Sequence, residues 1–351
     1  MATDASVTLE SRIKGAIHGV AVGDALGGPV EFQRRGTFGK VTGYQMNMNF
    51  NLPPGCWTDD TSMTLCLAQS FITARTFSAL DQLQNYIAWH KSGYLSVSDY
   101  CFDIGNLTLQ TLGYWNSRLP RKNTNESSSS HSDHGPISDE ALATLQTNLN
   151  KNFKRSIFCG NGSLMRTVPI GLFYFSSSPE EITKYSHLAS ELTHPYPTNG
   201  EACAAYCILV AYTLSSSPNT PSKQDMFAKF KEFQFDDPTL KSRFETYDTL
   251  ADIRDRPEKN ISSSGYVVNS LEAALWAFFS TDSYQEGCIR VVNLGDDADT
   301  VGAIYGGLAG AYYGLDAIPA DWKEGLVKKE VVGRIADELY QVIIEREQQN
   351  Q

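Results

Sequence analysis

Two acidic clusters, far apart in the chain, each combine aspartates with a threonine at the start of a predicted helix. Their members are Thr58, Asp59, Asp60, Asp296, Asp297, Asp299 and Thr300. Taken alone, the first cluster fits helix capping, with Thr58 as the N-cap and the acidic side chains near the positive end of the helix dipole. Capping needs only one polar side chain, however, and it leaves the second, matching cluster unexplained. A chemical role shared by the two clusters is the better interpretation.

A metal site explains both clusters. Carboxylates and threonine hydroxyls are hard oxygen ligands that suit Mg²⁺ or Mn²⁺. A third segment, VGDALGGPVEF, adds Glu31 seven residues after Asp24. With Glu31 there are enough ligands for two ions about 3.5–4 Å apart, and the adjacent side chains of Asp59 and Asp60 diverge, so that each can reach a different ion. The residues therefore predict a site for two divalent cations.

Helices must position these residues. Apolar residues recur with a helical period over residues 9–20, 79–91, 265–280 and 328–347. Ser178 before Pro179 predicts a further helix start, and Thr198 with Glu201 is interpreted as a capping box. Strand patterns are scarce, so we predict an all-α fold.

The segment after Asp299 is rich in glycine and alanine. Glycine in a helix interior costs about 1 kcal/mol relative to alanine, so we expect this helix to pack closely against its neighbours in a bundle. No repeat of 20 to 50 residues is visible. We predict a single domain over residues 1–351, with a flexible serine-rich insertion at about residues 122–136.

Composition, net charge and cysteine content indicate the class of protein, its partners and its compartment. The chain has 351 residues, 41% of them hydrophobic and 20% charged, which is a globular composition. Its formal net charge of −11 argues against direct nucleic-acid binding through the whole surface. The seven scattered cysteines and the lack of a secretory or membrane-spanning segment predict an intracellular protein, cytoplasmic and possibly also nuclear. We expect a monomer.

In order along the chain, six segments resemble motifs of the ADP-ribosylglycohydrolase family, most closely its dinitrogenase reductase-activating glycohydrolase branch. They are GDALGGPVE, WTDDT, FDIGNLT, GNGSLMR, LTHPYP and DADT. The resemblance covers nearly the whole chain and implies a compact orthogonal helical bundle with a central two-metal cleft. Asp296 stands where many relatives have glycine, so it is left out of the implied site.

The resemblance implies a role for each motif residue. The implied metal ligands, for two ions of Mg²⁺ or Mn²⁺, are Glu31, Thr58, Asp59, Asp60, Asp297, Asp299 and Thr300. The implied catalytic residues are Glu31, Asp60, Asp103 and Asp299. The implied substrate contacts are Gly105, Asn106, Gly160, Asn161, Gly162, Ser163 and His194.

The implied activity is metal-dependent hydrolysis of the bond between ADP-ribose and a protein side chain, which reverses mono-ADP-ribosylation. The partners would be ADP-ribose and ADP-ribosylated proteins. Asp103, in FDIGN, favours arginine linkage, because arginine-acting members carry an aspartate near the scissile bond. The alternatives are hydrolysis of serine-linked ADP-ribose or O-acetyl-ADP-ribose, and a non-catalytic relative that only binds ADP-ribose.

Two other enzyme classes share parts of these motifs. DADTV satisfies the nucleophile motif of haloacid-dehalogenase-type phosphatases, but that motif must end a strand of a Rossmann-like sheet, and here a helix follows at once. A terpene-synthase-like enzyme would need DDxxD, and DDADT misplaces the last acid.

Overall fold

The computed structural model describes residues 6–120 and 137–349. Within these ranges it contains sixteen α-helices, four short 3₁₀ helices and no strand, with two isolated β-bridges. The prediction of an all-α fold is confirmed. The predicted serine-rich insertion at residues 122–136 lies outside the described residues.

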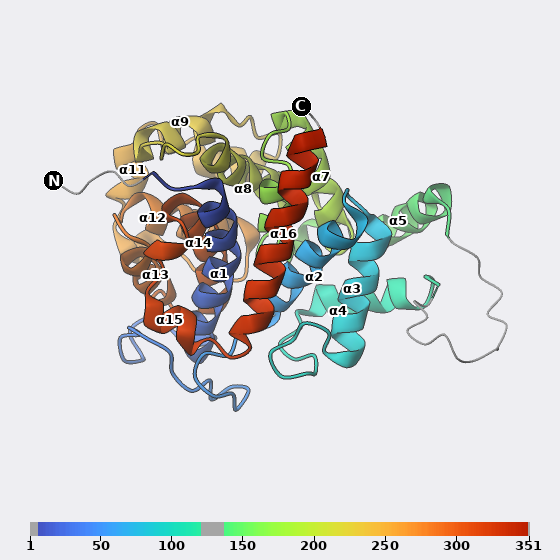
Figure 1. Cartoon of the computed structure of the whole chain (residues 1–351), viewed down its shortest axis with the longest axis horizontal. Coiled ribbons are helices and arrows are strands. Elements are labelled where there is room, and N and C mark those ends of the chain that lie inside the picture. The colour runs from blue at the N-terminus through green and yellow to red at the C-terminus, as the bar shows by residue number, and fades with distance from the viewer. Residues whose placement is uncertain (1–5, 121–136, 350–351) are drawn as a thin grey trace.

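Figure 1 shows the helices in chain order, with α16 beside α1 and α2, and α5 projecting from one side. The α-helices are α1 (Leu9–Gly27), α2 (Asp59–Ala74), α3 (Ala79–Ser92), α4 (Asn106–Asn116), α5 (Asp139–Phe153), α6 (Val168–Phe173), α7 (Pro179–Glu191), α8 (Pro197–Ser215), α9 (Lys223–Glu232), α10 (Pro238–Phe244), α11 (Leu250–Arg254), α12 (Val267–Phe279), α13 (Tyr284–Val292), α14 (Ala298–Tyr313), α15 (Ala320–Gly325) and α16 (Lys329–Gln349). The 3₁₀ helices are η1 (Gly28–Val30), η2 (Ser156–Phe158), η3 (Glu258–Asn260) and η4 (Leu315–Ala317).

Two helix starts predicted from polar side chains have different outcomes. The Ser178 hydroxyl caps α7 by accepting a hydrogen bond from the backbone N–H of Glu181, as predicted. The capping box predicted at α8 is wrong, because the N-cap is Tyr196 and makes no side-chain capping bond. Thr198 and Glu201 instead bond to Asp237, so they hold the start of α8 against the start of α10.

Helices α1 and α14 pack antiparallel with their backbones in contact. The facing pairs are Gly15 with Gly310, Gly19 with Gly306, Gly23 with Gly302, and Gly27 with Ala298. A Cβ atom on Gly19 would lie 2.1 Å from the carbonyl oxygen of Gly306, so no larger residue fits at this position. The expected close packing of the glycine-rich helix is confirmed. It places the end of α1 beside the start of α14, where the acidic residues lie.

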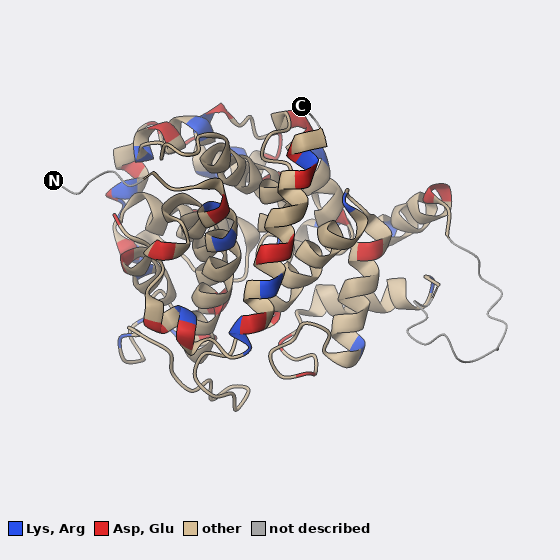
Figure 2. Cartoon of the chain, in the orientation of Figure 1, with Lys and Arg blue, Asp and Glu red and all other residues tan. Residues whose placement is uncertain are grey.

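Figure 2 shows basic and acidic residues interspersed on the face that it presents, notably along α16. Among the described residues, no helix is both long enough and apolar enough to cross a membrane.

Candidate metal and substrate cleft

A cleft of about 1030 Å³ opens where η1 meets the first turns of α2, α4 and α14. The predicted site residues that line it are Glu31, Asp59, Asp103, Gly105, Asn106, Gly160, Asn161, Gly162, His194, Asp297, Asp299 and Thr300. Thr58, Asp60 and Ser163 are not part of the lining and are buried. The structure therefore brings residues from six separate chain segments to one cavity.

Five carboxylates form two overlapping groups that share Asp299. Oxygen atoms of Asp24, Asp60 and Asp299 lie within 4.8 Å of one another. Oxygen atoms of Glu31, Asp103 and Asp299 do the same. Two adjacent groups of hard oxygen donors are the arrangement that two neighbouring divalent cations require.

The Thr58 side chain points into the first carboxylate group and does not cap α2. Thr58 is the N-cap residue of α2, yet its side chain makes no capping hydrogen bond. Its hydroxyl oxygen lies 3.0 Å from oxygens of both Asp24 and Asp60. Asp24 also accepts hydrogen bonds from the backbone N–H and the hydroxyl of Thr61. Asp24 thereby fastens the start of α2 to α1, and the capping interpretation fails for the Thr58 side chain.

The remaining predicted ligands lie at the edge of these groups. Asp59 lines the cleft and Asp297 accepts a hydrogen bond of 2.6 Å from the Asn161 side-chain amide. The Thr300 hydroxyl bonds to the carboxylates of Asp60 and Asp297 and lowers the pKa of both, against the larger effect of burial. Asp59 and Asp297 belong to neither of the two groups of three.

The carboxyl groups resist ionisation together. Burial, followed by repulsion from neighbouring carboxylates, raises the pKa of Asp59, Asp60 and Asp299 well above the usual 3.8. Burial, and then the charge of Asp103, raises the pKa of Glu31 far above 4.5. Burial also raises the pKa of Asp103. A group of carboxyls in this state is poised to exchange protons for cations.

Unpaired oxygens show that the donor set fits divalent cations. Glu31 Oε2, Asp60 Oδ1 and Asp103 Oδ2 are buried without a hydrogen-bond partner among the described residues. A buried carboxylate oxygen without a partner is costly, and a cation removes that cost. The N-termini of α2 and α14 also lie at the cleft and place their positive dipole ends near these charges.

The loop before α4 brings Asp103 to the cleft in an unusual backbone conformation. Asp103 has a φ of 55°, in the left-handed region that aspartate tolerates better than most residues. Gly105 is the N-cap of α4 and Asn106 is its first residue. This turn directs Asp103 toward Glu31, and carboxylate oxygens of the two residues lie within 4.8 Å of each other.

A second wall consists of the glycine-rich segment 160–163 and His194. The backbone N–H of Asn161 bonds to the Gly265 carbonyl, which ties this segment to the loop before α12. A Cβ atom on Gly162 would lie 2.8 Å from Cε1 of His194, so glycine is required where the backbone passes the ring. The Ser163 hydroxyl accepts a hydrogen bond from Ser190 and faces away from the cleft.

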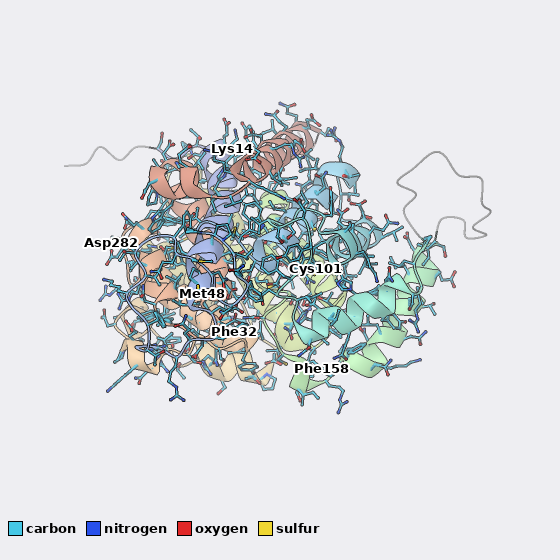
Figure 3. All side chains as sticks on the ribbon, turned by 90° about the horizontal axis from the view of Figure 1, so that it is seen from below. Lys14, Phe32, Met48, Cys101, Phe158 and Asp282 are labelled. Atoms are coloured by element: carbon cyan, nitrogen blue, oxygen red, sulfur yellow. The ribbon has the colours of Figure 1, made fainter. Side chains whose placement is uncertain are left out.

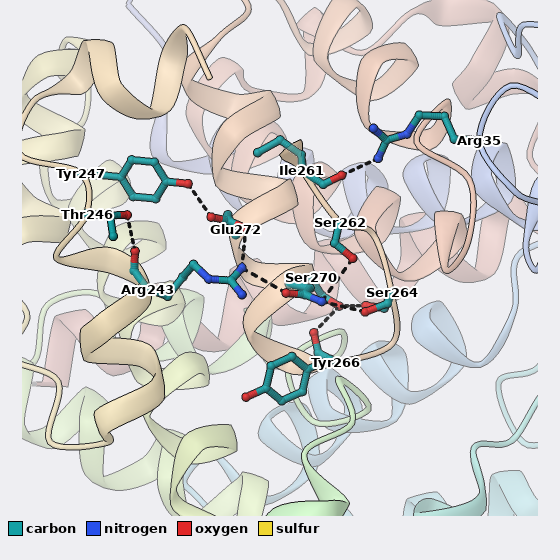
Figure 4. Close-up of polar contacts among 11 residues, drawn as sticks. Arg35, Arg243, Thr246, Tyr247, Ile261, Ser262, Ser264, Tyr266, Ser270 and Glu272 are labelled. Carbon is teal, nitrogen blue, oxygen red and sulfur yellow. Dashed lines mark hydrogen bonds and ion pairs between the residues drawn. The ribbon is translucent and has the colours of Figure 1, made fainter. Parts of the chain in front are cut away.

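A polar network supports the third wall, formed by Ser264 and Gly265 (Figure 4). The Asn269 side chain donates to the hydroxyls of Ser262 and Ser264 and accepts from Arg243. Arg243 also pairs with buried Glu272 at 2.6 Å. The loop next to Asp297 is thereby held by contacts that do not use the cleft itself.

The matching family model, described as ADP-ribosylglycohydrolase, spans residues 5–349. The chain belongs to the ADP-ribosylglycohydrolase family. The family consists of enzymes that hydrolyse glycosidic bonds. The resemblance inferred from the motifs is therefore confirmed.

Named relatives and a solved structure of the family cover most of the chain. It is 31% identical to the ADP-ribosylarginine hydrolase Tri1 of Serratia proteamaculans over 94% of this chain and 79% of that protein. It is 27% identical to the ADP-ribosyl-dinitrogen reductase glycohydrolase of Rhodospirillum rubrum over 92% of both chains. A solved ADP-ribosylglycohydrolase-related protein complex is similar with a TM-score of 0.70 and 30% identity, over 95% of this chain and 99% of that one.

The rim of this glycohydrolase cleft carries an exposed aromatic side chain. Phe32 lines the cleft and is 69% exposed, on the face that Figure 3 turns toward the viewer. Its backbone has a φ of 62° and is fixed by two reciprocal backbone hydrogen bonds, which join residues 32 and 33 to Asp296. Asp296 itself is exposed and is a member of neither carboxylate group.

Two residues of the site are not predicted by the sequence motifs. Asp24, in the same segment as Glu31, is not among the predicted ligands, although its oxygens lie with those of Asp60 and Asp299. Arg166, the last residue of GNGSLMR, has no predicted role. It is buried and its guanidinium bonds to the Gly162 carbonyl, beneath the wall of the cleft. A buried arginine has no signature in the sequence beyond its place within the motif.

Proposed function

We propose that this protein is a metal-dependent hydrolase that removes ADP-ribose from arginine side chains of proteins. The observation that carries the proposal is the two sets of three carboxylates that share Asp299 and lie at a cleft of about 1030 Å³. Such a cleft is large enough for a nucleotide sugar. The printed name of a relative with 31% identity, an ADP-ribosylarginine hydrolase, supports the arginine linkage.

Hydrolysis at the anomeric carbon of ribose requires stabilisation of an oxocarbenium-like centre and an activated water. We propose Asp103 as the group that exchanges the proton at the scissile bond. It faces the cleft, and burial raises its pKa to about 7, which is close to the pH at which such a group works best. A carboxylate oxygen of Glu31 lies within 4.8 Å of one of Asp103.

Two divalent cations, Mg²⁺ or Mn²⁺, would bind ribose hydroxyls and lower the pKa of a bound water. Their proposed ligands are Glu31, Thr58, Asp59, Asp60, Asp297, Asp299 and Thr300, joined by Asp24. The proposed substrate contacts are Gly105, Asn106, Gly160, Asn161, Gly162, Ser163 and His194. Backbone N–H groups of the glycine-rich segment suit the diphosphate. Because Ser163 points away from the cleft, we expect it to contribute through its backbone.

We also propose that the enzyme acts as a monomer inside the cell, in the cytoplasm and possibly also the nucleus. All seven cysteines are free thiols, six of them buried, which is the usual state of cysteines in a reducing compartment.

The test is release of ADP-ribose from peptides carrying arginine-linked or serine-linked ADP-ribose, and from O-acetyl-ADP-ribose. Each substrate is assayed with Mg²⁺, with Mn²⁺ and with EDTA. We expect metal-dependent release, fastest from the arginine-linked peptide. Asp60→Asn should lose at least about 100-fold in rate, since removing even an indirect metal contact typically costs 10–100-fold. Asp99→Asn is the control, because this side chain is exposed, pairs with Lys328 and does not line the cleft.

The two alternatives give different results in the same assay. Preferred release from the serine-linked peptide or the ester would replace the arginine linkage but keep the metal site. If no substrate is cleaved while ADP-ribose still binds in calorimetry, the protein is a non-catalytic reader and the proposed activity is wrong.

A further inference from the structure

Arg166 places a fixed hydrogen-bond donor beneath the wall of the cleft. It is 2% exposed, and its guanidinium lies 4.6 Å from the centroid of the Tyr86 ring. One nitrogen donates to the Gly162 carbonyl at 3.0 Å, and another donates to the Thr193 hydroxyl at 2.6 Å. Guanidinium remains protonated in proteins and can only donate, so the Thr193 oxygen must accept this bond.

The Thr193 hydroxyl links Arg166 to His194, and the bond from Arg166 determines how the hydroxyl can bond to the ring. It is fully buried, and its second partner is Nδ1 of His194 at 2.8 Å. If Nδ1 donated to it, the hydroxyl proton would have no acceptor among the described residues. A buried donor without an acceptor is strongly disfavoured. The hydroxyl therefore donates to Nδ1.

The remaining proton of the ring then sits on Nε2. Burial, followed by the positive charge of Arg166, lowers the pKa of His194 to about 3, so the ring is neutral near neutral pH. A neutral imidazole that accepts at Nδ1 carries its proton on Nε2. Nε2 lies on the cleft side, 3.0 Å from the position of a Cβ on Gly162 and 3.8 Å from one on Gly160. No hydrogen bond within the described residues uses Nε2.

We propose that Arg166, acting through Thr193, is a positioning residue that holds His194 as the neutral Nε2–H tautomer. His194 then donates a hydrogen bond to a substrate oxygen, of the diphosphate or a ribose hydroxyl, and does not act as a base. The inference rests on the proposed function, which makes this cleft the ADP-ribose site. It leaves the carboxylates as the proton-exchanging groups of the reaction.

The tautomer is measured directly by NMR of the free full-length protein with ¹⁵N-labelled histidine. His194→Gln identifies the His194 signals by their loss. We expect a protonated Nε2 and an unprotonated Nδ1 in the wild type at pH 7. A protonated Nδ1, or a doubly protonated ring, overturns the proposal whatever the activity.

Variants of Thr193 test whether its hydroxyl links Arg166 to His194, a connection called the relay below. Thr193→Val removes the hydroxyl at nearly equal volume, and we expect a mixture of the two ring tautomers and a loss of about tenfold in kcat/KM, the value of one hydrogen bond to a ligand. Thr193→Ser should restore both the spectrum and the rate. Thr213→Val is the control for loss of a buried hydroxyl, because the Thr213 hydroxyl has no partner among the described residues beyond the Leu209 carbonyl in α8 and the Met226 sulfur.

Two outcomes separate this inference from the proposed function. If Thr193→Val folds as well as Thr213→Val and keeps the wild-type spectrum and kcat/KM, the relay is wrong although the enzyme is active. If the wild type neither binds nor hydrolyses ADP-ribosyl substrates, the proposed function fails. In that case the donor role of His194 toward this substrate falls with it, and the NMR spectrum still decides the tautomer.

Discussion

Asp103 is the carboxylate of the cleft whose replacement separates proton exchange from metal binding. It lies in a loop and one of its oxygens has no partner. We predict that Asp103→Asn lowers kcat by about 10²- to 10⁴-fold, the usual contribution of a general acid or base. The affinity for Mn²⁺, measured by calorimetry, should fall much less than in Asp60→Asn, because Asp103 is not among the proposed ligands and asparagine keeps one side-chain oxygen beside Glu31 and Asp299. Asparagine keeps the size and the left-handed backbone preference, so the loop should persist.

A matched control stands four residues earlier in the same loop. Asp99 also has a positive φ, of 60°, but its side chain is exposed and pairs with Lys328. Asp99→Asn should therefore keep the wild-type kcat. If Asp103→Asn instead loses Mn²⁺ binding to the same extent as Asp60→Asn, then Asp103 is a metal ligand and the proton-exchanging group lies elsewhere.

The residues of the site could be predicted from the sequence only where a motif carries them. The two acidic clusters and Glu31 were found by residue type and spacing, and all of them lie at one cleft or directly behind it. Asp24 was not assigned, because its place depends on how α1 meets α2, which no local pattern encodes. Arg166 was missed for the same reason, since its partners Gly162 and Thr193 lie on separate segments.

Among the helices, the α1–α14 pair sets the geometry of the acidic cleft. We predict that Gly306→Ala is strongly destabilising, by about 3 kcal/mol or more, because its Cβ would lie 2.0 Å from the Gly19 carbonyl oxygen. Relief of this clash requires the two backbones to move apart, which also separates Asp24 from Asp299. Chemical denaturation should therefore show a lower free energy of unfolding, and any folded fraction should bind Mn²⁺ more weakly.

The control for this change is a glycine in a helix with free space around it. A Cβ on Gly333, within α16, would have no atom within 4 Å. Gly333→Ala should stabilise the protein by up to about 1 kcal/mol through helix propensity. Equal effects of the two substitutions would show that propensity, and not backbone contact, governs the α1–α14 pair.

Helices were predictable where their pattern is local. The predicted segments at residues 79–91 and 265–280 match α3 (Ala79–Ser92) and α12 (Val267–Phe279) to within a few residues. The capping box predicted at α8 is wrong because both side chains bond to Asp237. The Asp237 carboxylate accepts a hydrogen bond from the Thr198 hydroxyl, and the Asp237 backbone N–H donates to the Glu201 carboxylate. Side chains that can cap a helix can equally bond to a neighbouring helix, and the sequence does not distinguish the two.

At the scale of the whole molecule, the metal-free protein should lose stability as pH rises. A carboxyl group whose pKa is higher in the folded chain contributes stability that is present below its unfolded pKa and is lost as pH rises through its folded pKa. For Asp24, burial raises the pKa from 3.8 to about 6. Burial also raises the pKa values of Asp59, Asp60 and Asp299 well above 3.8, so the loss of stability continues to higher pH.

We therefore predict that Tm in EDTA falls between pH 5 and pH 8, while Tm with saturating Mn²⁺ changes less over this interval. A ligand at 100 times its Kd stabilises by about 2.7 kcal/mol, so the difference between the two conditions should be widest at pH 8. Differential scanning calorimetry at matched ionic strength measures both. A Tm gap that does not grow with pH would mean that the buried carboxyls are not the groups that the cation relieves.

The same argument predicts that one site mutation makes the metal-free protein more stable. Asp60→Asn removes a fully buried carboxyl group. Burial raises the pKa of this group well above 3.8, and each pKa unit is worth about 1.4 kcal/mol. In EDTA at pH 8, Asp60→Asn should unfold at a higher temperature than the wild type, and at pH 5 the difference should shrink. Saturating Mn²⁺ should reverse the order, because the wild type gains binding energy that the variant has lost. Asp99→Asn, at an exposed position that does not line the cleft, should follow the wild type throughout. If Asp60→Asn is less stable than the wild type in EDTA at pH 8, the carboxylates of the cleft are held by contacts within the protein and do not depend on a cation.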